Sequence, residues 1–557
     1  MKTLLHVDDI VSISIPDCIV KISNNAFFNC RSLEEIDIPD SVTKIGSGAF
    51  MHCSSLKNVH IPYSVKSIDL FAFGYCGNAW FEVDERNEQY ASENGALYDK
   101  KKETLISGPA LIVNGICTIP NYVKNLEWLA FSSCTNLDTI TIPKSVENLY
   151  PMTFHNCGRI FFNVDSENRI YSSENGVLFD KYKKTLLIGS SLVDEGLCEM
   201  PSFIEEIGER AFFGNKELIK ACMSDNVKKI DDGAFEGCES LTEMCLSGSL
   251  TEIGPRTFQG CSSLERIEIP HSVDTISTEA FDGCTNLKGI FIPDSVESID
   301  FEAFNGCISA KFDVERNDFF SSIHGALFDE DGSALFSGHP LVDNGTCFVP
   351  ETVIEIHSCA FKGCTTLESI EIPDSVSAIR SSVFMGCTSL KDVHLPKKID
   401  RISFYTFKGC TSLTEITIPD AVEKIQNEAF KDCTSLKKIH MPDTVSRIGN
   451  GAFQGCVSIE TFKIPKRVKK IESMAFEGCT SLKEVTVPSS VSIIAMSAFE
   501  NCESLVEIVI PASVQKIEFA AFRGCDSAYF YVDSANQRYT SIEGRLYDKI
   551  DSKFIDV

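Results

Sequence analysis

The sequence repeats with a period of 23 residues, and this period constrains its fold more than any single residue does. The pair Ile38-Pro39 returns as Ile61-Pro62, and the template is clearest over residues 33–56, LEEIDIPDSVTKIGSGAFMHCSSL. Aligning these pairs gives 18 units in four blocks, which start at residues 15, 119, 200 and 349. A period between about 20 and 50 residues indicates stacked units that cannot bury their apolar faces alone. The sequence therefore predicts a solenoid.

Each position of the template has a physical meaning. Ile36 and Ile38 share one face of a strand, and Pro39 ends that strand because it lacks an N–H group. A short extended segment then returns the chain inward, and Phe50 with Cys53 fits a single helical turn. The Phe position is filled by Phe in all 18 units. Stacking should therefore place the strands in one parallel sheet and the Phe side chains in one apolar column.

The interruptions of the period are themselves repeats. Residues 81–100 read FEVDERNEQYASENGALYDK, and closely similar segments follow the other three blocks. Strand alternation, a turn glycine such as Gly95 and a hairpin with a charged tip predict a strand-plus-hairpin module. We place these modules at residues 77–118, 158–199, 308–348 and 526–557 of one continuous solenoid domain, residues 1–557.

The template I-P-x-S-V-x-x-I-x-x-x-A-F-x-x-C-x-S-L resembles the BspA-like, or Treponema pallidum-type, leucine-rich repeat. The module V-D-x-x-N-x-x-Y-x-S-x-x-G-x-L-Y-D-K is similar to one found among the same proteins. With the period, this resemblance implies an α/β repeat solenoid that is predominantly β. It would be a right-handed superhelix with a parallel concave sheet of short strands and single helical turns. It also implies a surface protein that adheres to host proteins or neighbouring cells.

Composition narrows the partner and the location. The net charge of −28 opposes binding to nucleic acid, and no apolar run is long enough to span a membrane. Asp8 and Asp9 lie where a signal peptide needs apolar residues. The resemblance favours the cell surface; a cytoplasmic protein, unconventional export and a segment of a longer product remain alternatives. We expect a monomer.

The chain has 24 cysteines, and 17 of them occupy one column of the repeat, as Cys53 and Cys410 do. Equivalent side chains of adjacent units project in parallel, about 4.8 Å apart, whereas a disulfide needs Cβ atoms directed toward each other. We interpret this column as a ladder of free, buried thiols that pack as small apolar groups. Cys222 and Cys245 fall on the outward strand face, and we expect them to be exposed.

No phosphate loop, nucleophile elbow, zinc motif or calcium loop is present. His394 and His440 share an outward strand position but lie two units apart, about 10 Å, which is too far for one metal ion. The acidic pairs of the modules are better explained as turn caps than as calcium ligands. We therefore predict no catalytic residue, metal or cofactor.

What remains is the outward strand face, where varied polar residues stand on an almost constant core. Over residues 349–525 we predict a protein-binding concave face. Its candidate residues are Glu371, Asp392, His394, Glu415, Thr417, Lys438, His440, Lys463 and Glu484. The expected function is adhesion to a protein or a cell-surface macromolecule without catalysis. The alternative is an intracellular interaction scaffold, or the recognition segment of a longer protein.

Overall fold

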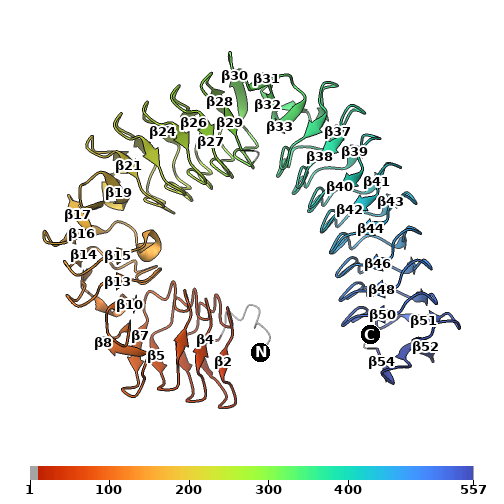
Figure 1. Cartoon of the computed structure of the whole chain (residues 1–557), viewed down its shortest axis with the longest axis horizontal. Helices are drawn as coiled ribbons and strands as arrows, with labels where there is room; N and C mark the ends of the chain where they lie inside the picture. The colour runs from red at the N-terminus through yellow and green to blue at the C-terminus, as the bar shows by residue number, and fades with distance from the viewer. Residues whose placement is uncertain (1–9, 301, 556–557) are drawn as a thin grey trace. The chain divides into compact units, whose positions relative to one another are not determined.

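The computed structural model describes residues 10–300 and 302–555 (Figure 1). The chain forms two compact units, Met1–Phe281 and Asp282–Val557, and each is a stack of short β-coils. The continuity of residues 1–557 as one domain stays a prediction.

Each coil begins with a strand of three or four residues, which we call the long strand. In the first unit these are β1 (Ser12–Ser14), β3 (Glu35–Asp37), β5 (Asn58–Ile61), β12 (Ile116–Thr118), β14 (Thr139–Ile142), β20 (Leu197–Glu199), β22 (Lys220–Cys222), β24 (Glu243–Cys245) and β26 (Arg266–Glu268). In the second they are β28 (Gly289–Ile292), β35 (Thr346–Phe348), β37 (Ser369–Glu371), β39 (Asp392–His394), β41 (Glu415–Thr417), β43 (Lys438–His440), β45 (Thr461–Lys463), β47 (Glu484–Thr486) and β49 (Glu507–Ile510).

The extended return of each coil forms a two-residue short strand. In the first unit these are β2 (Lys21–Ile22), β4 (Lys44–Ile45), β6 (Ser67–Ile68), β13 (Asn125–Leu126), β15 (Asn148–Leu149), β21 (Glu206–Ile207), β23 (Lys229–Ile230), β25 (Glu252–Ile253) and β27 (Thr275–Ile276). In the second they are β29 (Ser298–Ile299), β36 (Glu355–Ile356), β38 (Ala378–Ile379), β40 (Arg401–Ile402), β42 (Lys424–Ile425), β44 (Arg447–Ile448), β46 (Lys470–Ile471), β48 (Ile493–Ile494) and β50 (Lys516–Ile517).

Both kinds of strand pair in parallel with the equivalent strand of the next coil, so that equivalent residues lie opposite each other. Ile13 lies opposite Ile36 in the long strands, and Ile22 lies opposite Ile45 in the short strands. The sequence predicted one parallel sheet, whereas the structure has two sets of ladders, each divided into smaller sheets. The second set forms because the short return also runs straight for two residues, which is enough for parallel backbone hydrogen bonds.

The segment that carries the Phe column is a chain of reverse turns. The amide of Ala49 donates to Gly46 O within the coil, whereas the amide of Phe50 donates to Ala72 O of the next coil. Intra-coil and inter-coil bonds alternate in this way from residue 48 to residue 53. Among the described repeats, only η2 (Pro151–Phe154) forms a 3-10 helix at this place, so the expected helical turn is otherwise a turn ladder.

The Phe rings of successive coils stack face to face in the core. From Phe361 to Phe522 the centroids of neighbouring rings are 5.2–5.6 Å apart. Phe407 and its neighbour Phe430 are fully buried. This apolar stack supplies the main contact between coils.

The column cysteines are buried and form no disulfide, and many of their thiols contact the coil before them. The Cys410 thiol donates to the carbonyl of Phe384 at 3.1 Å, and the Cys433 thiol to that of Phe407 at 3.0 Å. Burial, and then the neighbouring thiol, raises the pKa of Cys410 well above its ordinary value. The sequence predicted a small apolar group here, but the thiol is also a hydrogen-bond donor between coils.

Modules interrupt this pattern after each block. The strands are β7 (Trp80–Val83), β8 (Tyr90–Glu93), β9 (Ala96–Asp99), β10 (Thr104–Ser107) and β11 (Ile112–Val113) in the first module; β16 (Phe161–Val164), β17 (Tyr171–Glu174), β18 (Val177–Asp180) and β19 (Thr185–Ile188) in the second; β30 (Lys311–Val314), β31 (Phe320–Ile323), β32 (Ala326–Asp329), β33 (Ala334–Ser337) and β34 (Val342–Asp343) in the third; and β51 (Tyr529–Val532), β52 (Tyr539–Ile542), β53 (Arg545–Asp548) and β54 (Lys553–Phe554) in the fourth. The 3-10 helices η1 (Pro109–Leu111), η3 (Ser190–Leu192) and η4 (His339–Leu341) lie in the first three.

Each module ends one Phe stack, and the first three start another. Phe162 of β16 packs edge-on against Phe154 with centroids 5.3 Å apart, and Phe530 packs in the same way against Phe522. The next stack begins over a glycine: a Cβ on Gly189 would lie 2.3 Å from the Phe212 ring. Only glycine leaves room for that ring.

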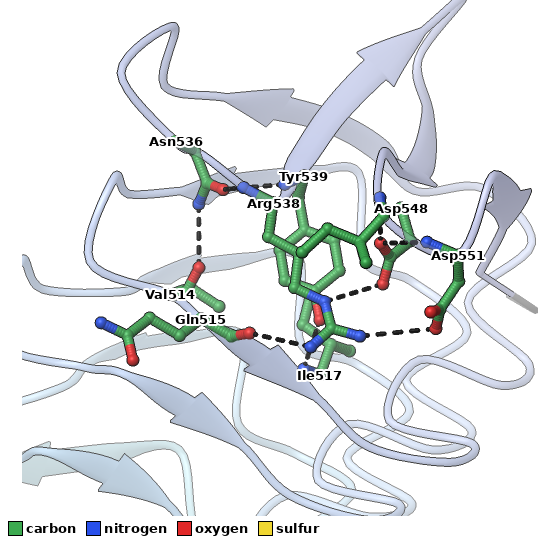
Figure 2. Close-up of polar contacts among 9 residues, drawn as sticks. Val514, Gln515, Ile517, Asn536, Arg538, Tyr539, Asp548 and Asp551 are labelled. Carbon is green, nitrogen blue, oxygen red and sulfur yellow. Dashed lines mark hydrogen bonds and ion pairs between the residues drawn. The ribbon is translucent and has the colours of Figure 1, made fainter.

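An Asn and a Tyr bind the module to the coil before it (Figure 2). The Asn536 amide donates to the carbonyls of Pro511 and Val514 at 2.9 and 3.0 Å. The Tyr539 hydroxyl accepts the Ile517 amide at 2.8 Å, where a further short strand would otherwise pair. Asn168 and Tyr171 make the same contacts in the second module.

The third module keeps the Asn but differs from the others at the tyrosine and at a nearby lysine. Asn317 keeps both carbonyl contacts at 2.8 Å. Phe320, however, replaces the tyrosine and has no hydroxyl to accept the Ile299 amide. Glu330 replaces the lysine that elsewhere donates to the Asn carbonyl, as Lys181 does.

Within the described part of the modules, only the fourth has an ion pair with a buried carboxylate beside this contact. Arg538 Nε donates to Asp548 Oδ2 at 2.9 Å, and its other nitrogens reach Asp551 and the carbonyl of Gln515 (Figure 2). Asp548 is 1% exposed. Burial alone would raise the pKa of Asp548, but hydrogen bonds from the Asp551 amide and from Arg538 lower it below its ordinary value.

Candidate binding face

We use the name long-strand face for the outward surface of the long strands β37, β39, β41, β43, β45, β47 and β49 and of the module strand β51. It carries all nine residues predicted from the sequence. Each of those nine side chains is exposed, while the residue between each outward pair is buried or half-buried. In Figure 1 the labels of β41 and β43 lie on the outer side of the second unit's curve, and those of β40 and β42 lie nearer its inner side. The long strands thus lie on the outer side of this curve, whereas the sequence predicted that they would form a concave face.

Glu415, Lys438 and His440 form a polar cluster on the paired strands β41 and β43. His440 Nε2 lies 2.7 Å from Glu415 Oε1, and Lys438 Nζ lies 3.9 Å from Glu415 Oε2. The hydrogen bond from His440, and then the charge of Lys438, lowers the pKa of Glu415. Thr417 lies opposite His440 in the same register.

The long-strand sheet is not continuous across the predicted face. Its pieces are β34-β35-β37-β39, β41-β43 and β45-β47-β49-β51, so the nine residues belong to three sheets. A groove of about 370 Å³ opens between β43 and β45, lined by Thr417, His440, Met441 and Lys463 among others. The turn ladder continues past this groove, since the Phe453 amide donates to Ala475 O at 2.9 Å.

Phe462 lines the groove between β43 and β45. It occupies the buried position of the long strand that Ile416, Ile439 and Val485 hold in nearby coils. Its ring lies 5.0 Å from Phe453 and 4.7 Å from Phe476, between two members of the Phe stack. The Phe stack stays closed beside the groove, with the Phe453 and Phe476 centroids 5.6 Å apart.

The other predicted residues are spread along the face rather than gathered. His394 Nδ1 lies 3.8 Å from Asp392 Oδ2 on the same strand, β39. Glu371 lies opposite His394 in the register of β37 and β39. Lys463 lines the groove, and Glu484 lies on β47.

Sequence reasoning missed the continuation of the face onto the fourth module. Thr486 of β47 pairs with Val509 of β49, which pairs with Tyr531 of β51. In the same way, Glu484 pairs with Glu507, which pairs with Tyr529. Val509 is 52% exposed, and both tyrosines are 46% exposed. The alternation of Tyr529 and Tyr531 around the buried Phe530 is the sequence signal that would have found them.

A separate cavity of about 310 Å³ lies in the first unit, next to His155. The Tyr75 hydroxyl lies 2.7 Å from His155 Nδ1, and the His52 ring stacks on Tyr75 with centroids 4.2 Å apart. Burial, and then the charge of His52, lowers the pKa of His155 to about 4, and burial raises the pKa of Tyr75 to about 12. At neutral pH the pair is thus an uncharged hydrogen bond rather than an acid–base pair.

Among residues 10–300 and 302–555, no three His, Cys, Asp or Glu side chains are grouped closely enough to hold a metal ion. None of the helices within these residues has the length and apolar character needed to cross a membrane. What the long-strand face offers is polar side chains, a groove and an exposed aromatic pair.

Comparisons with known proteins agree with the repeat architecture. The family model described as the BspA type leucine rich repeat region, in six copies, matches residues 4–88, 115–187, 197–313, 335–456 and 400–529. No curated protein matches the chain.

Several solved structures are similar in part. A leucine-rich repeat protein from Eubacterium ventriosum is 24% identical, over 59% of this chain and 82% of that one, with a TM-score of 0.46. A leucine rich cell surface protein from Faecalibacterium prausnitzii is 20% identical, over 66% and 93%, with a TM-score of 0.40. The T. pallidum leucine rich repeat protein is 27% identical, over 34% and 88%, with a TM-score of 0.29. Because the family model covers most of its length, the chain belongs to the BspA-type leucine-rich repeat family.

Proposed function

We propose that this protein binds another protein, or a cell-surface macromolecule, through the long-strand face and without catalysis. The observation that carries the proposal is the contrast between the two sides of each long strand. The inward residues are nearly all apolar and buried, whereas the outward ones change from coil to coil and stay exposed. Repeat proteins use such an extended, varied surface to bind macromolecules.

The charge of the chain favours a partner with basic surface. With a net charge of −28, association should weaken as salt rises. We place the protein at the cell surface as an adhesion protein on the resemblance of its repeats. An intracellular scaffold is the alternative, and labelling of intact cells with a membrane-impermeant reagent separates the two.

The test is charge reversal on the face. The triple variant Asp392→Lys, Glu415→Lys, Glu484→Lys should weaken binding to a captured partner at least tenfold, because three exposed carboxylates are lost from the face. The matched control Glu423→Lys, Asp443→Lys, Glu503→Lys changes the charge equally at exposed positions outside the long strands. Equal affinity for the two folded variants would move the site off this face.

A further inference from the structure

The end of the long-strand face nearest the fourth module has two carboxylates side by side. Glu484 of β47 and Glu507 of β49 lie directly opposite each other in a parallel pair, and both are exposed. Directly opposed like charges destabilise a sheet. Among the described residues, neither carboxylate has an ion pair or a side-chain hydrogen bond to relieve this repulsion.

Two acidic residues elsewhere in the same column face bases. Glu243 lies opposite Lys220, with Nζ 2.9 Å from Oε2, and Glu415 lies opposite Lys438. The chain thus supplies a cation beside these carboxylates but not beside Glu484 and Glu507. The basic side chain next to Glu484, Lys483, contacts Glu460 at 2.8 Å instead.

Two tyrosine rings adjoin the carboxylates. Tyr529 is the neighbour of Glu507 in β51, and Tyr531 is the neighbour of Val509. The centroids of the two rings are 4.8 Å apart. The Tyr529 ring lies over Gly544, where a Cβ would come within 2.3 Å of the ring.

We propose that this patch, formed by Glu484, Glu507, Val509, Tyr529 and Tyr531, binds an arginine-bearing segment of the partner. Carboxylates accept paired hydrogen bonds from a guanidinium, and aromatic faces attract a cation. A planar guanidinium satisfies both at once, which an ammonium does less well. The inference rests on the proposed function and names the chemistry of its partner at one end of the face.

The probe is a labelled peptide, Gly-Arg-Gly-Arg-Gly, with its citrulline analogue as the uncharged match. We expect the arginine peptide to bind the full chain at low salt, and the citrulline peptide to bind about tenfold more weakly or not measurably. The double variant Glu484→Gln, Glu507→Gln should weaken arginine-peptide binding about tenfold. The control Glu503→Gln, Asp526→Asn, which removes two exposed carboxylates outside the long strands, should bind as the unaltered chain does.

Thermal unfolding gives a second, independent measurement. Because the double variant removes a repulsion, its unfolding temperature should rise slightly, whereas the control's should not. Tyr531→Ala, which leaves Tyr529 seated on Gly544, should weaken arginine-peptide binding severalfold.

Three results would overturn the inference. They are equal arginine-peptide affinity in the double variant and the control, equal binding of the citrulline peptide, and binding of a neutral oligosaccharide in place of the peptide. Failure of this inference would not refute the proposed function. The double variant Asp392→Lys, Glu415→Lys tests the part of the long-strand face outside this patch.

Discussion

Repeats and modules contact the preceding coil through different chemistry. In the block from Val349 to Cys525, buried Phe rings stack at 5.2–5.6 Å, and the thiols and turn amides bind the adjoining coil. The second and fourth modules each have one edge-on Phe, and their specific contacts are the amide of Asn168 or Asn536 and the hydroxyl of a tyrosine. The apolar contacts recur with each 23-residue repeat. The polar contacts, in contrast, mark the places where a module interrupts the repeats.

The largest expected effect is on the apolar side of this comparison. Phe407→Ala should lower the free energy of unfolding by about 3–5 kcal/mol, because it opens a cavity between two coils. Denaturant titration followed by fluorescence or circular dichroism measures it. The control is Phe404→Ala in the same coil, where the ring is 41% exposed and the loss should stay below about 1 kcal/mol. Similar losses at both positions would contradict the stack as the main contact.

Removing the amide of a module should cost nearly as much. Asn168→Ala leaves the carbonyls of Pro143 and Val146 without their donors, and two module amides without an acceptor. We expect a loss of about 3 kcal/mol, localised by hydrogen exchange to residues 158–199. Asn163→Ala, at an exposed position of β16, is the control. Exchange that is unchanged in the module would show that the amide is dispensable.

His339 predicts an acid sensitivity confined to the third module. Its ring is buried, and burial lowers its pKa from 6.5 to about 4. The unfolded chain therefore binds the proton first, so this contribution is fully present above pH 6.5 and is lost as the pH falls toward 4. The loss should reach about 3 kcal/mol. His339→Ser, which copies Ser190 of the second module, should flatten the pH dependence of unfolding, and a parallel curve would contradict this.

The smallest effect is expected from removing a tyrosine hydroxyl from one module or adding one to another. Tyr171→Phe should cost about 1 kcal/mol, because the Leu149 amide loses its acceptor. Phe320→Tyr should bring the opposite change to the third module by offering an acceptor to the Ile299 amide. Chemical denaturation of the two variants provides the test, and a change of the same sign in both would count against the tyrosine contact.

Much of this fold follows from the sequence, because period and burial are local properties. The 23-residue spacing, the Phe column and the buried thiols all describe the coil correctly. The turn ladder was not predictable, since alternate amides bind a partner 22 residues away and positive φ angles occur at residues such as His52. The division of the sheet was also missed, because the breaks after β39 and β43 leave no mark in the regular spacing of the repeats.

The exposure of the candidate residues was predicted from the sequence, but the continuation of their rows onto the fourth module was not. Alternation along the strands identified Asp392, Glu415 and Glu484 as outward residues, and they are exposed. Glu507 belongs to the repeats and Tyr529 to the fourth module, so no single sequence pattern joins them to Glu484. Register places Glu507 and Tyr529 in the same row, and only the pairing of β47, β49 and β51 shows this.

Hydrogen exchange of the full chain with and without a captured partner tests the binding claim most directly. We expect the bound partner to slow exchange in the strands of the long-strand face, which are β37, β39, β41, β43, β45, β47, β49 and β51. Exchange in the short strands β38, β40, β42, β44, β46, β48 and β50 should not change. Slower exchange confined to the short strands or to the first three modules, with the long strands unchanged, would contradict it.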